Sequence, residues 1–228
     1  MSLPARFDLY APIHKALRLF MTDTLQALGR LDLDDPQDFE AGLARLDALL
    51  DAAGSHLQHE NDFIHPVIEA RSSGTSTRIA AEHRDHLEAI AALRAQAAAL
   101  RLQPEAAAAH RLYRQLAAFV AENFEHMDIE ETRHNQALWA ACRDDELQAI
   151  EGRILASIGP QEMSQWLRWL IPALMPGERA QLIAGLPPAA QAPVLASARS
   201  LLDDVAWAKL CRAMGQVGPV ATPDLAGA

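Results

Sequence analysis

Two motifs of the form His-x-x-x-Glu stand in separate parts of the chain, at His56 and Glu60 and at His126 and Glu130. In an α-helix, residues four positions apart lie on the same face, one turn above the other. Each motif therefore presents one imidazole and one carboxylate side by side. These are ligands that first-row transition metals accept. The two motifs indicate a metal site if the helices that carry them face each other.

Three further histidines, His14, His83 and His86, occupy inward positions of other predicted helices, where a bundle normally has leucine or valine. Burying so many ionisable groups without partners would cost several kcal/mol each, whereas a bound cation turns them into ligands. A single buried histidine is more often an ordinary core residue, but the convergence of four helices favours a metal. The predicted metal ligands are His14, His56, Glu60, His83, His86, His126 and Glu130.

Four long amphipathic helices are predicted to carry these residues, and they begin near residues 8, 36, 77 and 105. Asp35 and Pro36 have the form of an N-cap followed by a first-turn proline, and Pro66 is expected to kink or end the second helix. The predicted inward stripe of the second helix is Leu46, Leu49, Ala53, His56, Glu60, Phe63 and Val67. That of the third is Ile79, His83, His86, Ile90, Leu93, Ala97 and Leu100. That of the fourth is Leu112, Leu116, Phe119, Asn123, His126, Glu130 and Ala137.

Short connections make consecutive helices antiparallel, so the fold class predicted for residues 1–142 is an all-α, antiparallel four-helix bundle. His14 and His83 lie early in their helices, whereas His56 and His126 lie late in theirs. Antiparallel packing therefore brings all four histidines to one end of the bundle. Residues 143–214 are predicted to form a smaller helical extension with Trp166, Trp169 and Trp207 as packing anchors, and residues 215–228 a frayed tail.

Composition narrows the functional classes. The formal net charge of −10 argues against binding to nucleic acid or to an anionic membrane. The first residues lack the apolar core of a secretory signal, and the longest uncharged stretch is interrupted by prolines, so we expect no membrane span and a cytoplasmic protein. Two distant cysteines exclude a disulfide scaffold and a thiolate zinc site.

A ligand set of imidazoles with carboxylates able to bridge two ions suits a pair of first-row metals, and the pattern suggests two non-heme irons. Such paired ions typically lie roughly 3.5–4 Å apart. Zinc is less suitable, because the ligands are too many for one tetrahedral ion and include no thiolate. Since histidines outnumber carboxylates here, we expect a centre that favours reversible ligand binding over committed oxidation.

The sequence resembles the hemerythrin family, and specifically bacterial hemerythrin-like (HHE cation-binding) proteins. The resemblance rests on four segments: HKALR at His14, HLQHENDFIHP from His56, EHRDH at His83 and HMDIEETRHNQALW from His126. It implies a four-helix bundle with a di-iron centre that binds O2 or NO. It further implies iron ligation by His14, His56, Glu60, His83, His126 and Glu130, with the two glutamates as bridges.

Two positions depart from the classical family pattern. That pattern would place the second histidine of the third helix at the position of Leu87, and it would select Glu131 as the acid of the fourth helix. The inward stripes favour His86 and Glu130 instead, and both alternatives stay open. His110 and His134 are expected to be non-ligands. His59 and His65 flank the second-helix motif and are expected to be mostly solvated or hydrogen-bonded, although either could be an alternative ligand or support one.

These observations predict a non-heme di-iron protein that binds O2 or NO for sensing, storage or delivery, in a pocket lined by Leu17, Phe63 and Phe119. The first alternative is an oxidase or peroxidase that uses the same irons in defence against oxidative or nitrosative stress. The second is a helical scaffold with a structural metal. The C-terminal helices are expected to serve as a lid or as the surface of a homodimer.

Overall fold

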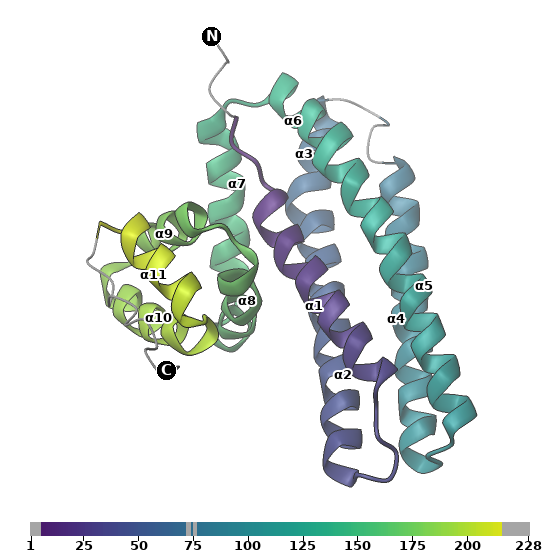
Figure 1. Cartoon of the computed structure of the whole chain (residues 1–228). Helices are drawn as coiled ribbons and strands as arrows, with labels where there is room; N and C mark the ends of the chain where they lie inside the picture. The colour runs from purple at the N-terminus through teal and green to yellow at the C-terminus, as the bar shows by residue number, and fades with distance from the viewer. Residues whose placement is uncertain (1–5, 72–73, 75–76, 216–228) are drawn as a thin grey trace, which may run out of the picture. The chain divides into compact units, whose positions relative to one another are not determined.

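The computed structural model describes residues 6–71, 74 and 77–215, and every regular element in that part of the chain is helical (Figure 1). Four long helices are α1 (Ala11–Gly29), α2 (Pro36–His59), α4 (Thr77–Leu102) and α5 (Ala106–Ile129). Two of them continue through π-helical turns, η1 (Glu60–Ile64) and η2 (Glu130–His134), into α3 (His65–Arg71) and α6 (Asn135–Ala141). The shorter helices are α7 (Asp144–Ser157), α8 (Pro160–Ala173), α9 (Pro176–Gly185), α10 (Pro188–Leu201) and α11 (Asp204–Ala213).

The four long helices lie side by side in an antiparallel bundle (Figure 1). Helix α1 packs against α2 and α5, and α4 packs against the same two helices. The start of α2 follows the predicted chemistry, since the Asp35 side chain accepts hydrogen bonds from the backbone N–H groups of Gln37 and Asp38, and Pro36 is the first helical residue. The predicted bundle is therefore confirmed.

The π turns interrupt the α-helical periodicity immediately after His59 and Ile129. In each turn the backbone N–H bonds to the carbonyl five residues earlier, from His65 to Glu60 and from Asn135 to Glu130. Each turn therefore holds one extra residue, and the inward stripe shifts by one position. The stripes predicted beyond the glutamates are wrong for this reason. The buried residues are Ile64, Ile68 and Leu138, instead of Phe63, Val67 and Ala137.

The second helix does not end at Pro66. The chain passes through η1 and stays helical to Arg71. Proline lacks an N–H and clashes with the carbonyl four residues earlier, and the wider turn just before Pro66 accommodates both effects. The same five-residue turn occurs in η2, where no proline follows. Proline is therefore not the common cause of the two turns, and what they share is a buried glutamate at the first position.

One end of the bundle is closed by an apolar group that we call the end cluster. Its members are Tyr10, Ile64, Ile68, Leu138, Cys142, Leu147 and Ile150. Because α7 supplies Leu147 and Ile150, the structure groups α7 with the bundle, and the compact unit ends at Gly159. The sequence analysis places α7 in the extension instead, and the domain division at residue 142 stays a prediction.

The second compact unit begins at Pro160 and has a core of its own. This core consists of Ile171, Ile183, Val194, Ala198, Leu202 and Leu210. Buried Arg179 donates hydrogen bonds to the backbone carbonyls of Ile171 and Pro172, which are among the carbonyls that the end of α8 leaves unpaired. Of the predicted anchors, Trp166 is buried, whereas Trp169 and Trp207 are half-buried.

The frayed tail predicted for residues 215–228 lies, apart from Gly215, outside the described residues. Both cysteines are free and buried. In the described part of the chain, no helix combines the length and the apolar character needed to cross a bilayer.

Candidate metal centre

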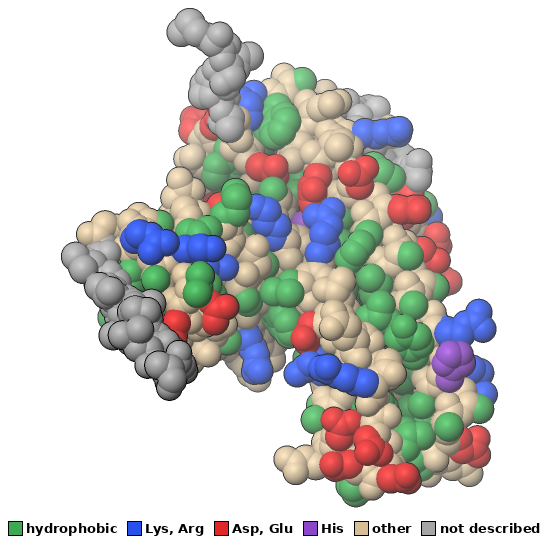
Figure 2. Space-filling view, in the orientation of Figure 1, with side chains coloured by type: hydrophobic (Ala, Val, Ile, Leu, Met, Phe, Trp, Pro, Cys, Tyr) green, Lys and Arg blue, Asp and Glu red, His purple; other side chains and the backbone are tan. Residues whose placement is uncertain are grey.

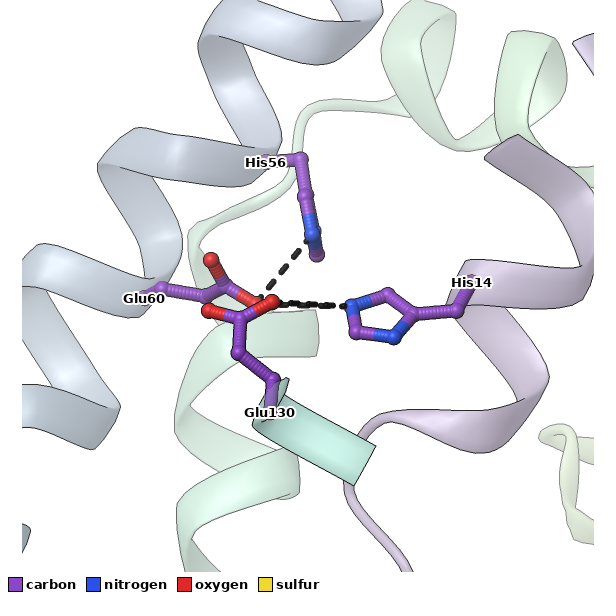
Figure 3. Close-up of side chains that lie close together, drawn as sticks. All are labelled: His14, His56, Glu60 and Glu130. Atoms are coloured by element: carbon purple, nitrogen blue, oxygen red, sulfur yellow. Dashed lines mark ion pairs between the residues drawn. The ribbon is translucent and has the colours of Figure 1, made fainter. Parts of the chain in front are cut away.

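Six of the seven predicted ligands meet at one end of the bundle, in two groups that share both glutamates. One group contains His14 and His56, and the other contains His83 and His126. Within each group the donor atoms lie within 4.8 Å of one another. Figure 3 shows the first group, with both carboxylates directed toward the two imidazoles. All these side chains are buried, and Figure 2 accordingly shows little histidine on the bundle face in view.

The carboxylate of Glu60 divides its oxygens between the two histidine pairs. Its Oε1 lies 3.7 Å from His14 Nε2 and 3.1 Å from His56 Nε2, whereas its Oε2 lies 3.4 Å from His83 Nε2. One carboxylate therefore faces two sites at once, as a bridging ligand does.

Glu130 divides its oxygens in the same manner. Its Oε2 lies 3.5 Å from His14 Nε2. Its Oε1 lies 3.6 Å from His83 Nε2 and 3.3 Å from His126 Nε2. Each histidine pair thus faces one oxygen from each glutamate, and each position offers two nitrogens and two oxygens.

These spacings are close to those of atoms that share a metal ion. For donor–metal bonds of about 2.1 Å, neighbouring ligand atoms lie roughly 3.0–3.4 Å apart. The two Nε2 atoms of His83 and His126 are 3.0 Å apart. Within the described residues, both oxygens of Glu60 and of Glu130 and the Nε2 atoms of His14 and His56 are buried without a hydrogen-bond partner. Buried polar atoms are seldom left so in proteins, and two cations would satisfy them.

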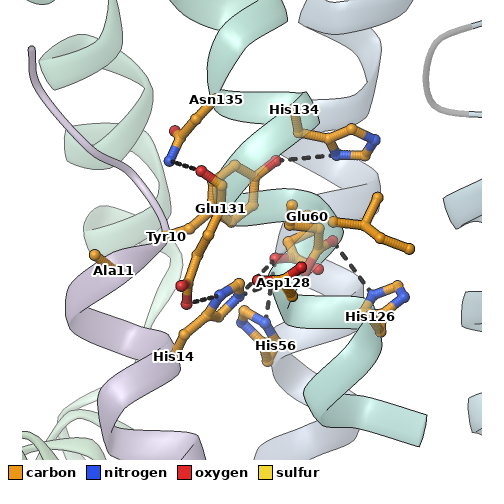
Figure 4. Close-up of polar contacts among 12 residues, drawn as sticks. Tyr10, Ala11, His14, His56, Glu60, His126, Asp128, Glu131, His134 and Asn135 are labelled. Atoms are coloured by element: carbon orange, nitrogen blue, oxygen red, sulfur yellow. Dashed lines mark hydrogen bonds and ion pairs between the residues drawn. The ribbon is translucent and has the colours of Figure 1, made fainter.

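Neighbouring side chains fix the orientation of three imidazoles. Nδ1–H of His14 donates to Glu131 Oε1 at 2.9 Å (Figure 4). The same oxygen accepts a hydrogen bond from Arg18 at 2.5 Å. Nδ1–H of His83 donates to Asn61 Oδ1 at 2.9 Å. A proton on Nδ1 leaves the lone pair of Nε2 directed at the carboxylates, which is the arrangement that metal-binding histidines use.

His126 is held in the same way, because its Nδ1–H donates to Glu82 Oε2 at 2.9 Å. The two π turns supply equivalent partners for the other histidines. Asn61 follows Glu60 directly, and Glu131 follows Glu130 directly. Each turn therefore provides one carboxylate shared by the two groups and, at the next residue, one hydrogen-bond acceptor for a histidine on a neighbouring helix.

Burial and ion pairing shift the pKa values of these groups in the metal-free protein. Burial lowers the pKa of His14, but the hydrogen bond with Glu131 and the nearby Glu60 carboxylate outweigh it and raise the pKa to about 9. The pKa of His126 is also raised to about 9, because the nearby Glu130 carboxylate and the hydrogen bond with Glu82 outweigh burial. Without metal, the site thus holds protons on imidazoles that a metal needs in neutral form.

The pKa values of the remaining groups of the site are also shifted by their surroundings. Burial and the positive charge of His14 lower the pKa of His56. Burial and the charge of Glu130 raise the pKa of Glu60. Burial opposes ionisation of Glu130 as well, but the neighbouring His126 and His83 imidazoles outweigh it and lower its pKa.

The seventh predicted ligand, His86, is not brought into either group. It is buried, and its ring packs edge-on against His126 at 4.8 Å and against Phe119 at 6.0 Å between ring centroids. Leu87, at the classical family position, is 46% exposed and does not reach the core. His86 therefore supports the ring of a ligand candidate in this structure, and its role as a ligand stays a prediction.

Of the two acids left open in the fourth helix, the structure buries Glu130 among the histidines and places Glu131 behind His14. The η2 turn explains this choice, since Glu130 is its first residue and continues the inward stripe of α5. The position of Glu130 agrees with the heptad argument and not with the classical spacing.

Two histidines outside the predicted ligand set lie beside the centre. His65, expected to be mostly solvated or hydrogen-bonded or to be an alternative or supporting group of the site, is only 6% exposed and is therefore not solvated. His134 is 1% exposed, and its Nδ1 lies 3.4 Å from the Tyr10 hydroxyl (Figure 4). A ring nitrogen of each, together with an oxygen of Glu130, forms a third group within 4.8 Å. Sequence reasoning missed both because it continued the α-helical period through the π turns. By contrast, His59 is half-buried and His110 is exposed, as non-ligands can be.

Comparison with known proteins adds one finding. A family model described as the hemerythrin HHE cation binding domain matches residues 7–137, which contain every residue of the two metal-binding groups. No significant match was found among curated proteins or among solved structures.

Proposed function

Since the chain belongs to the hemerythrin HHE cation-binding family, we propose that its two histidine pairs and two bridging glutamates hold two non-heme iron ions, which bind a diatomic ligand, O2 or NO. The observation that carries this proposal is the division of each carboxylate between the pairs, with one oxygen facing each. A single metal would leave half of these buried donors without a partner.

The donor count supports iron and an exogenous ligand. Each position receives two imidazole nitrogens and two carboxylate oxygens from the chain, which is fewer than the six donors of an octahedral ion. Positions remain for a small molecule. A pair of irons, when bound, supplies electrons to a ligand such as O2 and recovers them when the ligand leaves. The chain supplies a dry environment, because the end cluster and the bundle core bury the site.

Sensing, storage and delivery of the diatomic ligand are the roles that we propose, because the residues around the centre hold the histidines in place by hydrogen bonds. The outer partners Glu131, Asn61 and Glu82 hold the imidazoles rigidly in their metal-binding tautomer. Rigid ligands that do not rearrange favour reversible binding.

The test is metal content and optical response. The full chain is loaded anaerobically with Fe(II), freed of excess metal and analysed for iron and protein, and spectra are recorded before and after exposure to O2 or NO. Two irons per chain and a reversible spectral change are expected. No iron, or one tightly held zinc, would overturn the di-iron proposal and favour a structural metal. Two irons with rapid turnover of hydrogen peroxide would assign the centre to an oxidase or peroxidase.

A further inference from the structure

The third group of buried side chains lies against the centre, and its two histidines belong to neither of the two metal positions. A ring nitrogen of His65, a ring nitrogen of His134 and an oxygen of Glu130 lie within 4.8 Å of one another. The His65 ring stacks on the His83 ring at 4.8 Å between centroids and meets the His134 ring edge-on at 5.7 Å. This group therefore borders both a bridging carboxylate and a histidine of the second pair.

His65 has an unsatisfied polar atom in this place. Its Nε2 is buried, and no side chain or backbone group in the described part of the chain makes a hydrogen bond to it. Inward positions elsewhere on the bundle carry leucine, which would fill such a space without this penalty. A buried imidazole nitrogen next to a ligand-binding centre indicates a partner that is present only when a ligand is bound.

The surroundings of the two rings make a hydrogen bond there effective. Tyr10 is fully buried, and its hydroxyl lies 3.4 Å from His134 Nδ1, which restrains that ring. Tyr10 also belongs to the end cluster, which separates the group from solvent. In so dry an environment, a hydrogen bond to a charged or polar ligand atom is stronger than it would be in water.

We propose that His65 and His134 form the hydrogen-bonding wall of the ligand pocket and that His65 Nε2–H donates to the outer atom of a small ligand bound at the metal centre. The ligand class is a small anion or diatomic molecule with a negatively charged or lone-pair-bearing outer atom. This inference rests on the proposed function, because it requires a loaded centre.

A third metal at the same place is the competing interpretation, and the geometry disfavours it. Both oxygens of Glu130 already face the two histidine pairs, Oε2 toward His14 and Oε1 toward His83 and His126. A third cation would have to share one of these oxygens. A neutral ligand-binding wall needs no further charge compensation.

The experiment measures azide binding to the iron-loaded, air-oxidised protein, by absorbance titration and by the infrared band of the azide stretch. His65→Leu is expected to keep two irons per chain and to weaken azide binding about tenfold or more, with a shifted azide band. His65→Gln, which restores an N–H donor, should recover much of the affinity. His110→Leu removes an exposed histidine that belongs to none of the three groups and is the control, with azide binding unchanged.

Each other outcome is decisive. Unchanged azide affinity in His65→Leu with two irons present would overturn this inference and leave the di-iron proposal intact. Absence of iron from the unmodified chain would overturn the proposed function itself. Three metals in the unmodified chain and two in His65→Leu would assign a third metal site, and fewer than two irons in His65→Leu would make His65 a ligand. Should His65→Leu fail to fold, His65→Met makes the same comparison.

Discussion

The two ends of the bundle use equivalent inward positions for opposite purposes. Toward the α1–α2 and α4–α5 connections, these positions carry leucines that are at most 1% exposed: Leu43, Leu46, Leu93, Leu100, Leu112 and Leu116. Toward the other end, the same four helices and the π turns that continue two of them carry histidines and glutamates that are at most 8% exposed. Apolar burial stabilises the first end by itself, whereas the second end needs a partner for each charge.

Among the described residues, π turns occur only at the end of the bundle that carries the histidines and glutamates, which we call the ligand end. An uninterrupted α-helix would keep one stripe inward along its whole length, which suits leucine. Each π turn adds one residue and thereby brings further side chains, including His65 and His134, to the level of the bridging glutamates. The difference between the ends shows that the apolar end needs only the regular heptad, whereas the ligand end departs from it at the site.

The largest expected effect is the loss of both metals in Glu130→Gln. The amide cannot bridge two cations as a carboxylate does, and both histidine pairs face this side chain. Metal analysis after loading with Fe(II) should fall from two irons per chain to fewer than one. The matched control is Glu125→Gln, because Glu125 is an exposed acid of α5, the helix that leads into η2. This variant should retain both irons. Complete loss with Glu131→Gln and retention with Glu130→Gln would instead support the classical spacing.

Loading should depend strongly on pH at the ligand end. In the metal-free protein the pKa values of His14 and His126 are about 9, so both imidazoles are protonated at pH 7 and must lose protons to bind metal. Loading at pH 7, followed with a pH indicator in weak buffer, should release at least two protons per chain. Metal affinity should rise with pH up to about 9 and then level off.

The stability of the metal-free protein should change in the opposite direction. Because the folded pKa values of His14 and His126 lie above 6.5, their contribution is fully present below pH 6.5 and is lost as the pH rises through about 9. The urea midpoint should therefore fall from pH 7 to pH 9.5. Release of no proton on loading, with a flat urea midpoint, would contradict the ion-paired metal-free site.

The apolar end is tested by Leu116→Ala. Leu116 is fully buried between the helices, and removing its side chain should lower the free energy of unfolding by about 2–5 kcal/mol. The folded variant should still bind two irons, because no ligand is disturbed. Leu102→Ala is the control, since Leu102 is 84% exposed and its loss should change the stability by less than about 0.5 kcal/mol. Loss of iron from folded Leu116→Ala would show that the two ends are not independent.

Most of the bundle and of the ligand set could be predicted from the sequence, because both depend on regular spacing. The α4 stripe from Ile79 to Leu100 is buried as predicted, and six of the seven ligand candidates meet. What could not be predicted follows from the π turns. The sequence carries no periodic signal for one extra residue, so the stripe continued to Phe63 and Val67, and His65 stayed outside the site.

The smallest expected effect is that of His86→Leu. This variant tests whether an inward heptad position is sufficient to make a histidine a metal ligand. His86 and His83 are both inward residues of α4, yet only His83 Nε2 faces the glutamates, at 3.4 and 3.6 Å. His86→Leu should retain two irons with an affinity within about twofold, because leucine still fills the space beside Phe119. His83→Leu, on the same face and with the same change in side chain, should leave at most one iron. Loss of an iron from His86→Leu would show that the imidazole turns inward when metal binds. The helical periodicity of α4 would then predict the metal ligands better than the side-chain positions in the metal-free structure do.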